Sequence, residues 1–374
     1  MGEAIAHWLP ADHASGTFLG RAQSPEGPCV LHIAGGQIFD LTASTPTLAG
    51  AVARRAFEGG KEIGSVADGL PEGWLLLPPL DLQCIKACGV TFAVSAIERV
   101  IEERARGDAG KAAQLRGQLE ARVGTGIRSV VPGSPEAAGL KAALIEEGMW
   151  SQYLEVAIGP DAEVFSKSPV LSAVGAGAQI GIRSDSDWNN PEPEVVLVVA
   201  PDGEVVGATL GNDVNLRDFE GRSALLLSKA KDNCASCAIG PFVRLFDDGF
   251  GMDDVRAMTV ELEIEGPEGY LLTGANDMSQ ISRDPLDLVR QTMSEHHYPD
   301  GFVLFCGTLF APVQDRDAPG AGFTHKIGDT VTIRSDKLGT LTNTVNTSRD
   351  APPWEFGIGA LIRNLAGRGL ADRV

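Results

Sequence analysis

A hairpin of apolar residues in the middle of the chain constrains the fold more than any other feature of the sequence. Residues 195–199 form an unbroken run of Val and Leu, which is typical of a buried strand. A Pro-Asp-Gly turn at 201–203 follows, and residues 204–210 return as a second strand. We therefore predict a buried β-hairpin, around which the rest of the chain is organised.

Three carboxylates lie at the open end of this hairpin. If the turn is centred on Asp202, position 192 lies across from position 212, and period-two alternation places Glu192 and Glu194 on one face. Asp213 then reaches the same end. Such carboxylates repel one another unless a positive group lies between them, and oxygen ligands suit Mg²⁺ or Mn²⁺. From spacing alone, a metal site and a solvated strand end with ordinary acidic residues both remain open.

The composition excludes several classes of partner. The chain has 374 residues, 43% of them hydrophobic, which is enough for one large domain or two smaller ones. A formal charge of −19 argues against binding to nucleic acid or to an anionic membrane surface. The first residues lack a basic segment followed by an apolar one, and no run of 18 apolar residues occurs. We expect a soluble, cytoplasmic protein.

The six cysteines do not form a disulfide framework, because they are scattered through a long chain. Cys234 and Cys237 form a C-x-x-C pair, and Cys84 and Cys88 form a C-x-x-x-C pair. A structural zinc site is therefore an alternative. The first pair lies in an apolar stretch without the turn residues of a zinc knuckle, so buried free thiols are the preferred interpretation.

The chain divides into a small N-terminal α/β module, residues 1–78, and a larger domain, residues 79–374. The module contains short strand patterns separated by glycine-rich turns, and residues 75–80 read as a linker. Helices in the larger domain, between residues 89 and 147, could cover a site or pack on the surface. Besides the hairpin, strands are expected at 17–21, 29–33, 37–41, 164–169, 258–265, 270–272, 331–334 and 340–345. Helices are expected at 48–57, 89–123 (two segments), 135–147 and 285–293.

Eight short motifs stand out by their order and spacing in the chain. They are Glu192-Pro193-Glu194, Gly211-Asn212-Asp213, Lys229-Ala230-Lys231-Asp232, Ile239-Gly240-Pro241, Phe165-Ser166-Lys167-Ser168-Pro169, Gly307-Thr308, Gly328-Asp329-Thr330-Val331 and Leu338-Gly339-Thr340-Leu341. Over roughly residues 80–370 they resemble the fumarylacetoacetate hydrolase superfamily. The resemblance implies an α+β fold, a mixed β-roll of the C-terminal domain type in that superfamily. It also implies a metal-dependent enzyme that acts on a small-molecule 2-oxo acid.

The resemblance assigns roles to residues of these motifs. Glu192, Glu194 and Asp213 are expected to ligate Mg²⁺ or Mn²⁺, Lys229 to project into the same pocket, and Thr308 to hold the substrate carboxylate. A divalent ion chelated by a 2-oxo carboxylate would stabilise the enolate formed when a C3 proton leaves. A salt bridge to Asp232 or to one of the carboxylates is the structural alternative for Lys229. Ser166 and Lys167 are further candidates for contact with substrate hydroxyls.

One departure from the family pattern indicates the reaction. Hydrolases of this family carry a water-activating histidine after the first core strand, and Ser95 stands there in this chain, while the glutamate of the same motif is present as Glu98. Without the histidine, C–C hydrolysis lacks its usual base. A metal, a lysine and a carboxylate can still remove a proton and expel a hydroxyl group. We predict dehydration, with Ser95 contacting the substrate and Lys229 or Glu98 as the base.

With Gly89-Val90-Thr91-Phe92 and residues 282–289, the chain resembles the branch that contains 2-keto-3-deoxy-pentonate dehydratases of pentose degradation. That branch converts the D-xylonate or L-arabinonate derivative into 2,5-dioxopentanoate. The alternatives are an acylpyruvate-type C–C hydrolase or a decarboxylase of the same superfamily, a non-catalytic 2-oxo acid binder, and a structural zinc protein. We expect a homodimer or homotetramer.

Overall fold

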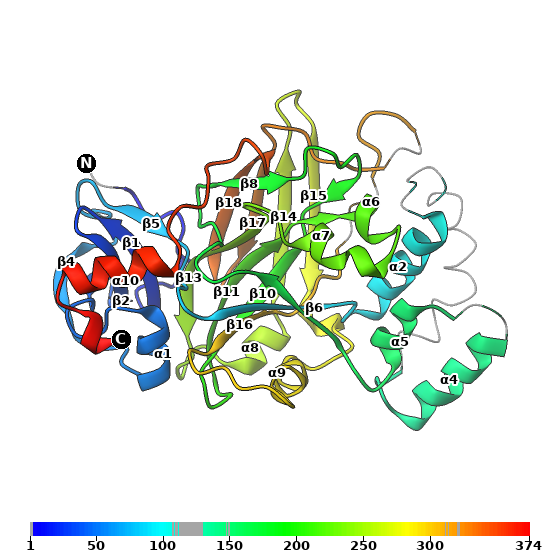
Figure 1. The fold of residues 1–374 in the computed structure, drawn as a ribbon, viewed down its shortest axis with the longest axis horizontal. Coiled ribbons are helices and arrows are strands. Elements are labelled where there is room, and N and C mark those ends of the chain that lie inside the picture. Colours follow the sequence, from blue (N-terminus) through cyan, green and yellow to red (C-terminus); the bar gives the residue numbers. More distant parts are fainter. Residues whose placement is uncertain are drawn as a thin grey trace.

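The computed structural model describes residues 3–374, apart from 107, 109, 110, 112–129, 147, 149, 311, 313, 320 and 321. Of residues 93–95, 97, 98 and 102 it describes the backbone alone. Two large β-sheets occupy the middle of the molecule, with the N-terminal strands at one end and a group of helices at the other (Figure 1). The second helical segment predicted before residue 123 lies outside the described residues.

The larger sheet has eleven strands and runs through most of the molecule, in the order β4-β3-β2-β1-β13-β11-β10-β16-β6-β7, with β5 paired to β1. It is mixed, because β16 and β6 run parallel while most of the other pairs are antiparallel. Its strands are β1 (Thr17–Ser24), β2 (Gly27–Ala34), β3 (Gln37–Asp40), β4 (Lys61–Ser65), β5 (Leu75–Leu77), β6 (Cys84–Gly89), β7 (Glu163–Ser168), β10 (Pro193–Val199), β11 (Val205–Asp213), β13 (Cys237–Leu245) and β16 (Phe302–Phe305).

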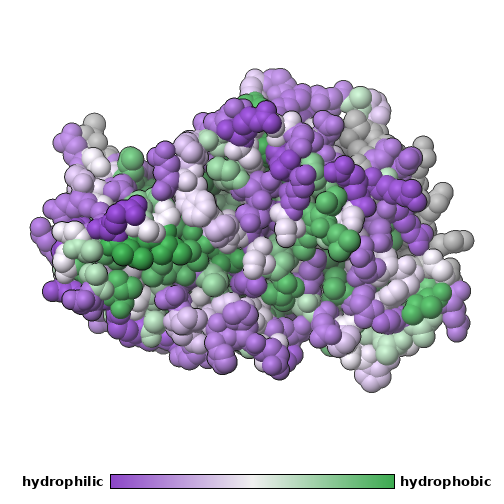
Figure 2. All heavy atoms as spheres, in the orientation of Figure 1, coloured by the Kyte–Doolittle hydropathy of each residue, from purple (hydrophilic) through white to green (hydrophobic). Residues whose placement is uncertain are grey.

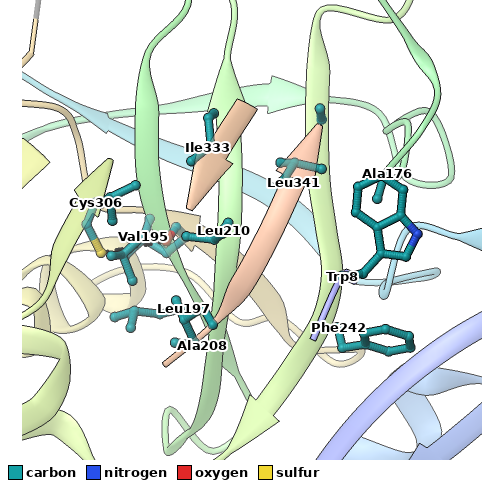
Figure 3. Close-up of a cluster of buried hydrophobic side chains, with 14 of the residues drawn as sticks. Trp8, Ala176, Val195, Leu197, Ala208, Leu210, Phe242, Cys306, Ile333 and Leu341 are labelled. Carbon is teal, nitrogen blue, oxygen red and sulfur yellow. Dashed lines mark hydrogen bonds between the residues drawn. The ribbon is translucent and has the colours of Figure 1, made fainter. Parts of the chain in front are cut away.

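A five-stranded sheet packs against one face of the larger sheet, and the main hydrophobic core lies between the two. Side chains of the central hairpin, such as Val195 and Leu210, lie opposite Ile333 and Leu341 of the smaller sheet (Figure 3). The smaller sheet has the order β15-β14-β17-β18-β8. Its strands are β8 (Gln179–Ile182), β14 (Thr259–Glu265), β15 (Leu271–Asp277), β17 (Thr330–Ser335) and β18 (Gly339–Thr347), and a separate short pair is formed by β9 (Asn189–Asn190) and β12 (Asn215–Leu216).

The predicted hairpin is present as β10 and β11, but its register differs by one residue from the prediction. Val199 pairs with Val205, as a turn centred on residue 202 requires, whereas Val198 pairs with Gly207. The β-bulge that this shift creates on β11 adds one residue to that strand. Position 192 therefore lies across from Asp213 rather than 212, and the Asp213 amide donates to the Glu192 carbonyl at 3.1 Å.

The N-terminal strands continue the larger sheet, since β1 pairs with β13. The stretch predicted as a linker is partly a strand: β5 pairs over Leu75–Leu77 with the part of β1 that β13 does not reach. The C-terminal helix α10 (Ile358–Gly367) packs on the same strands, with its Asn364 amide donating to the Glu26 carbonyl at 2.8 Å. The division at residue 78 stays a prediction.

Three helices gather at the end of the molecule opposite the N-terminal strands (Figure 1). They are α2 (Ala93–Ala105), α4 (Pro135–Glu146) and α5 (Gln152–Ile158), and they share a hydrophobic cluster of their own. This cluster is separate from the main core, so these helices form a distinct layer beside the sheets. The remaining α-helices among the described residues are α1 (Leu48–Arg54), α6 (Arg217–Glu220), α7 (Leu227–Lys231), α8 (Met252–Arg256) and α9 (Pro285–Met293).

The surface shows one large apolar area in the view of Figure 2, over helix α10. Ile358 and Ile362 of this helix are about half exposed or more, as is Trp354 just before it. The described helices include none that is both long enough and apolar enough to cross a membrane. Oligomer formation and cytoplasmic location stay predictions.

Candidate active site

The three carboxylates predicted from the hairpin converge at its open end. Glu192 and Glu194 flank the start of β10, and Asp213 ends β11. One carboxylate oxygen from each lies within 4.8 Å of the others, and all three residues are buried. The predicted convergence is therefore confirmed in the geometry, and the one-residue bulge places Asp213 directly across from Glu192.

Each carboxylate is held by a different part of the fold. Oε2 of Glu194 accepts from the Gly307 amide at 2.6 Å, where the chain leaves β16. Oε2 of Glu192 and Oδ2 of Asp213 both accept from the Lys231 ammonium, the latter at 2.9 Å. Oδ1 of Asp213 is buried and accepts no hydrogen bond, although Lys167 Nζ lies 3.0 Å away. A buried carboxylate oxygen left without a hydrogen bond has a lone pair available for a cation.

The electrostatics of this cluster favour a bound cation. Burial raises the pKa of Glu194 well above its ordinary value, and the neighbouring Asp213 and Glu192 raise it further. Burial acts in the same direction on Glu192, but Lys231 and Arg99 outweigh it and lower the pKa of that carboxyl to about 2. The donors are all carboxylate oxygens, which suit a hard divalent ion such as Mg²⁺ or Mn²⁺. The residues therefore fit a metal of this class.

The lysine in the cluster is Lys231 and not Lys229, which corrects the prediction. The two residues lie on the short helix α7, where a separation of two residues turns the side chain by about 200°. Lys231 points inward between Glu192 and Asp213. Lys229 is exposed, and its Nζ lies 5.5 Å from the centre of the Phe219 ring. Burial would lower the pKa of Lys231, but Asp213 and Glu192 outweigh it and raise that pKa, so the side chain is an ammonium.

The strand β7 separates the two substrate-contact candidates of one motif. Residues alternate across a strand. Lys167 is fully buried behind the carboxylates, where its Nζ donates to the Lys231 carbonyl and contacts Asp213. Ser166 faces the opposite side, is exposed and accepts from Lys86 at 3.0 Å. The structure therefore places Ser166 outside the site, and it places Lys167 as a support of Asp213 rather than as a wall residue.

Thr308 lines the cavity beside the carboxylates, where the resemblance predicts it. Its hydroxyl accepts from the Phe310 amide at 3.2 Å, so the chain makes a tight turn at this wall. The preceding Gly307 has φ +91°. A Cβ at Gly307 would lie 2.1 Å from the Thr91 hydroxyl, so only glycine brings the Gly307 amide to Glu194 here.

A glutamate that the sequence analysis did not single out also lines the cavity. Glu163 begins β7 on the same face as Phe165 and Lys167. Burial, and next the nearby Glu220, raise the pKa of Glu163 to about 7. A carboxyl group with such a pKa exchanges protons readily near neutral pH. Extending the predicted strand back by one residue would have placed Glu163 on the same face as Phe165 and Lys167, because side chains alternate along a strand.

The helical layer closes the cavity with Arg99. This residue of α2 donates to Glu192 Oε1 at 2.6 Å and to Glu220 Oε2 at 2.7 Å, so it ties the helix to the carboxylate cluster. Glu98 and Ser95 lie on the same helix, but their side chains are outside the described residues. The cavity is small, about 30 Å³, which is room for about two water molecules.

The cysteines do not build a metal site. All six are free thiols; Cys84 and Cys234 are exposed, while their partners in the two motifs are buried. Within the described part of the chain, the group of side chains that could hold a metal is formed by Glu192, Glu194 and Asp213. The structural zinc alternative therefore has no site among these residues.

The fold and the site define a class of proteins in which a mixed β-roll carries a buried carboxylate cluster at the open end of its central hairpin. Residues 147–346 match the model of the family described as fumarylacetoacetate (FAA) hydrolase C-terminal. This match covers more than half of the chain. The protein belongs to that family, and the predicted resemblance and α+β fold are confirmed.

Two curated proteins are similar to part of this chain. A probable 2-keto-3-deoxyxylonate dehydratase of Haloferax volcanii is 34% identical over 202 residues, which are 54% of this chain and 66% of that protein. A 2-dehydro-3-deoxy-D-arabinonate dehydratase of Saccharolobus solfataricus is 29% identical over 187 residues, 50% of this chain and 59% of that protein. The chain thus spans less than two thirds of the length of either relative.

A solved structure extends the similarity in fold over most of the chain. It is a 2-keto-3-deoxy-D-arabinonate dehydratase complexed with magnesium and 2,5-dioxopentanoate. The match has a TM-score of 0.64 and 20% identity, and it covers 88% of this chain and 99% of that one. At this identity the match establishes the shared fold.

Proposed function

We propose that this protein is a magnesium-dependent hydro-lyase that converts a 2-keto-3-deoxy-pentonate into 2,5-dioxopentanoate. The single observation that carries the proposal is the convergence of Glu192, Glu194 and Asp213 on one buried point. The dehydratase relatives support the choice of reaction, and the solved dehydratase with magnesium and 2,5-dioxopentanoate supports the choice of ion and product.

Glu192, Glu194 and Asp213 would hold the magnesium ion, which supplies a Lewis acid that polarises the ketone of a chelated 2-oxo acid. The chain's own residues then orient the substrate. Thr308 offers a hydroxyl to the substrate carboxylate from the wall beside Glu194. Lys167 keeps Asp213 in place from behind, and Lys231 bridges Asp213 and Glu192 inside the cavity. The two ammonium groups offset part of the negative charge of the three carboxylates.

Proton movement requires a group that can both take and give a proton near neutral pH. Glu163 fits this requirement, because burial and Glu220 raise its pKa to about 7 and it lines the cavity. We assign Glu163 as the group that removes the C3 proton or protonates the departing 4-hydroxyl. Glu98 remains the other candidate for one of these steps. Lys231, held as an ammonium, donates rather than accepts a proton.

The atoms of this reaction balance without a further reactant. The C3–H bond and the C4–O bond break, a C3–C4 double bond forms, and the proton and hydroxide leave as water. A proton then moves from C5 to C3, which shifts the double bond to C4–C5 as an enol. Transfer of the enol hydroxyl proton to C4 gives the C5 aldehyde.

The test is incubation of the protein and Mg²⁺ with 2-keto-3-deoxy-D-xylonate and, separately, with the L-arabinonate equivalent. We expect an aldehyde that a coupled semialdehyde dehydrogenase oxidises. Release of pyruvate from acylpyruvates without such an aldehyde would instead identify a C–C hydrolase, and release of CO₂ would identify a decarboxylase. Thermal stabilisation by both acids without any product would identify a binder without turnover.

A further inference from the structure

Two strands that line the cavity meet there in a pair of residues of very different size. Gly89 ends β6 and Glu163 begins β7, and the two residues lie directly opposite each other in the antiparallel pair. Both residues line the cavity. Side chains that lie opposite each other in such a pair stand on the same face of the sheet. A side chain at position 89 would therefore adjoin that of Glu163.

The carboxyl group of Glu163 lies in the space that a side chain at position 89 would occupy. A Cβ at Gly89 would lie 2.0 Å from Oε2, 2.8 Å from Cδ and 3.5 Å from Cγ of Glu163. Chain neighbours apart, these three atoms are the nearest to such a Cβ. The glutamate can lie over the backbone of β6 in this way only because position 89 carries no side chain.

The backbone itself does not require a glycine at this position. Gly89 has no positive φ, whereas the next residue, Val90, has a φ of +53°. The left-handed conformation at the end of β6 is therefore adopted by a β-branched residue, in which it is rare, and not by the glycine. The feature of the structure that does require glycine at position 89 is the room that it leaves for the carboxyl group of Glu163.

We propose that Gly89 is a positioning residue, whose missing side chain gives the carboxyl group of Glu163 its place in the cavity. The inference rests on the proposed function, in which Glu163 moves the proton, and it deepens it by naming the residue on which the place of this group depends. With a Cβ at position 89, Oε2 would have to move by more than about 1 Å to reach ordinary van der Waals contact. A displacement of about 1 Å in a reacting group can lower the rate by about 10²-fold.

The experiment measures kcat and KM of Gly89→Ala with a 2-keto-3-deoxy-pentonate and Mg²⁺. We expect kcat to fall by about 10²-fold and KM to change much less, because the group that moves the proton is displaced while the three carboxylates stay in place. In a Glu163→Asp background Gly89→Ala should have no further effect on kcat, since the shorter side chain ends at the position of Cγ, 3.5 Å from the new Cβ. A wild-type kcat in Gly89→Ala, or an equal fall in both backgrounds, would overturn the proposal.

Melting temperatures test the overlap itself, independently of turnover. Where the backbone permits it, a change from Gly to Ala stabilises a protein by restricting the unfolded chain. Gly89→Ala should therefore raise the melting temperature in a Glu163→Asp background, and raise it less or lower it where Glu163 is intact. Equal shifts in the two backgrounds would contradict the overlap.

Gly266→Ala, at the turn between β14 and β15, is the matched control. Its Cβ would lie 2.5 Å from Nη2 of Arg316 and 2.6 Å from Oε2 of Glu268, so it also displaces the end of a glutamate, but outside the cavity. This variant should keep the wild-type kcat. A fall in kcat as large as that of Gly89→Ala would overturn the specific role of Gly89.

Failure of the proposed function gives a different result. In that case wild type forms no 2,5-dioxopentanoate, and the exchange of the C3 protons of pyruvate in D₂O with Mg²⁺, followed by NMR, replaces turnover. This exchange needs an enolate and a group that moves the proton, but no dehydration. Exchange that is slow in Glu163→Gln but as fast in Gly89→Ala as in wild type would overturn the proposal. Where wild type shows no exchange either, the melting temperatures decide it.

Discussion

The two sides of the cavity are built in different ways. On the sheet side, Glu192, Glu194 and Asp213 stand on paired strands, and the hairpin beneath them belongs to the main core. On the helical side, α2 and α5 pack in a separate cluster, and Arg99 reaches across to Glu192. A side with its own small core opens at a lower free energy than a side embedded in the main core.

Besides Arg99, other contacts tie the helical side to the rest of the molecule. The Arg283 guanidinium donates to the Val156 and Gly159 carbonyls, both at 2.7 Å, and so caps the end of α5. The Thr91 hydroxyl, just before α2, donates to the Cys306 carbonyl at 2.7 Å. The comparison teaches that the three carboxylates stand on the side embedded in the main core, while Arg99 links them to the helical side.

The largest expected effect is on the sheet side. Asp213→Asn should lower kcat/KM by about 10³-fold or more, because the cation loses one of three ligands and charge complementarity. Steady-state kinetics with saturating Mg²⁺ measure this. Ser166→Ala, on the opposite face of β7, is the matched control and should keep wild-type activity. Substantial activity in Asp213→Asn would contradict a role of the three carboxylates in the mechanism.

The next largest effect on the kinetics is expected from the two lysines of α7. Lys231→Met should reduce kcat by about 10²- to 10³-fold, because it removes the ammonium between Glu192 and Asp213. Lys229→Met changes an exposed side chain two residues away and should leave kcat unchanged. A loss of kcat in Lys229→Met but not in Lys231→Met would instead support Lys229, which the sequence analysis assigned to the site.

Glu163→Gln tests the proton-transfer group through pH dependence. We expect a loss of about 10²-fold in kcat and the disappearance of the limb near pH 7 in the pH–rate profile. The metal-free variant should also be more stable than wild type at alkaline pH. A raised pKa makes the ionised carboxyl unfavourable in the folded state, so its cost is absent below pH 4.5, grows as pH rises, and is complete above about 7.

Melting temperatures from pH 4 to pH 9 check this sign. The difference between variant and wild type should be near zero at pH 4 and largest at pH 8 to 9. A difference that shrinks as pH rises would show that Glu163 is stabilised, rather than destabilised, by ionisation in the folded protein.

The smallest effect is expected from the helical side. Arg99→Met should change KM by about tenfold with little change in kcat, since Arg99 closes the cavity and does not hold the reacting atoms. Arg104→Met, on the exposed side of the same helix, serves as control. A loss in kcat as large as that of Asp213→Asn would contradict the assignment of substrate access to the helical side and of catalysis to the sheet side.

The sequence was most informative where local periodicity decides the structure. Alternation and a turn signal predicted the hairpin and the convergence of Glu192, Glu194 and Asp213. The bulge next to Val206 was not predictable, because period-two alternation does not show where an extra residue enters a strand. The choice between Lys229 and Lys231 failed for a related reason: the packing of a five-residue helix decides which of the two faces inward.

The helical side could not be predicted in the same detail. Arg99 and Glu192 are 93 positions apart, so no local pattern connects them. Glu163 lay just outside the predicted strand, and its importance depends on Glu220 and on burial, which a sequence does not display. Local signals therefore described the elements, while long-range contacts determined the composition of the cavity.

Titration of metal-free protein with Mg²⁺, followed by calorimetry, tests the central claim most directly. We predict one ion per chain in wild type and in Ser166→Ala, and no saturable binding in Asp213→Asn or Glu194→Gln, although these variants remain folded. Equal binding by wild type and both carboxylate variants would contradict the account, because the ion would then be held elsewhere.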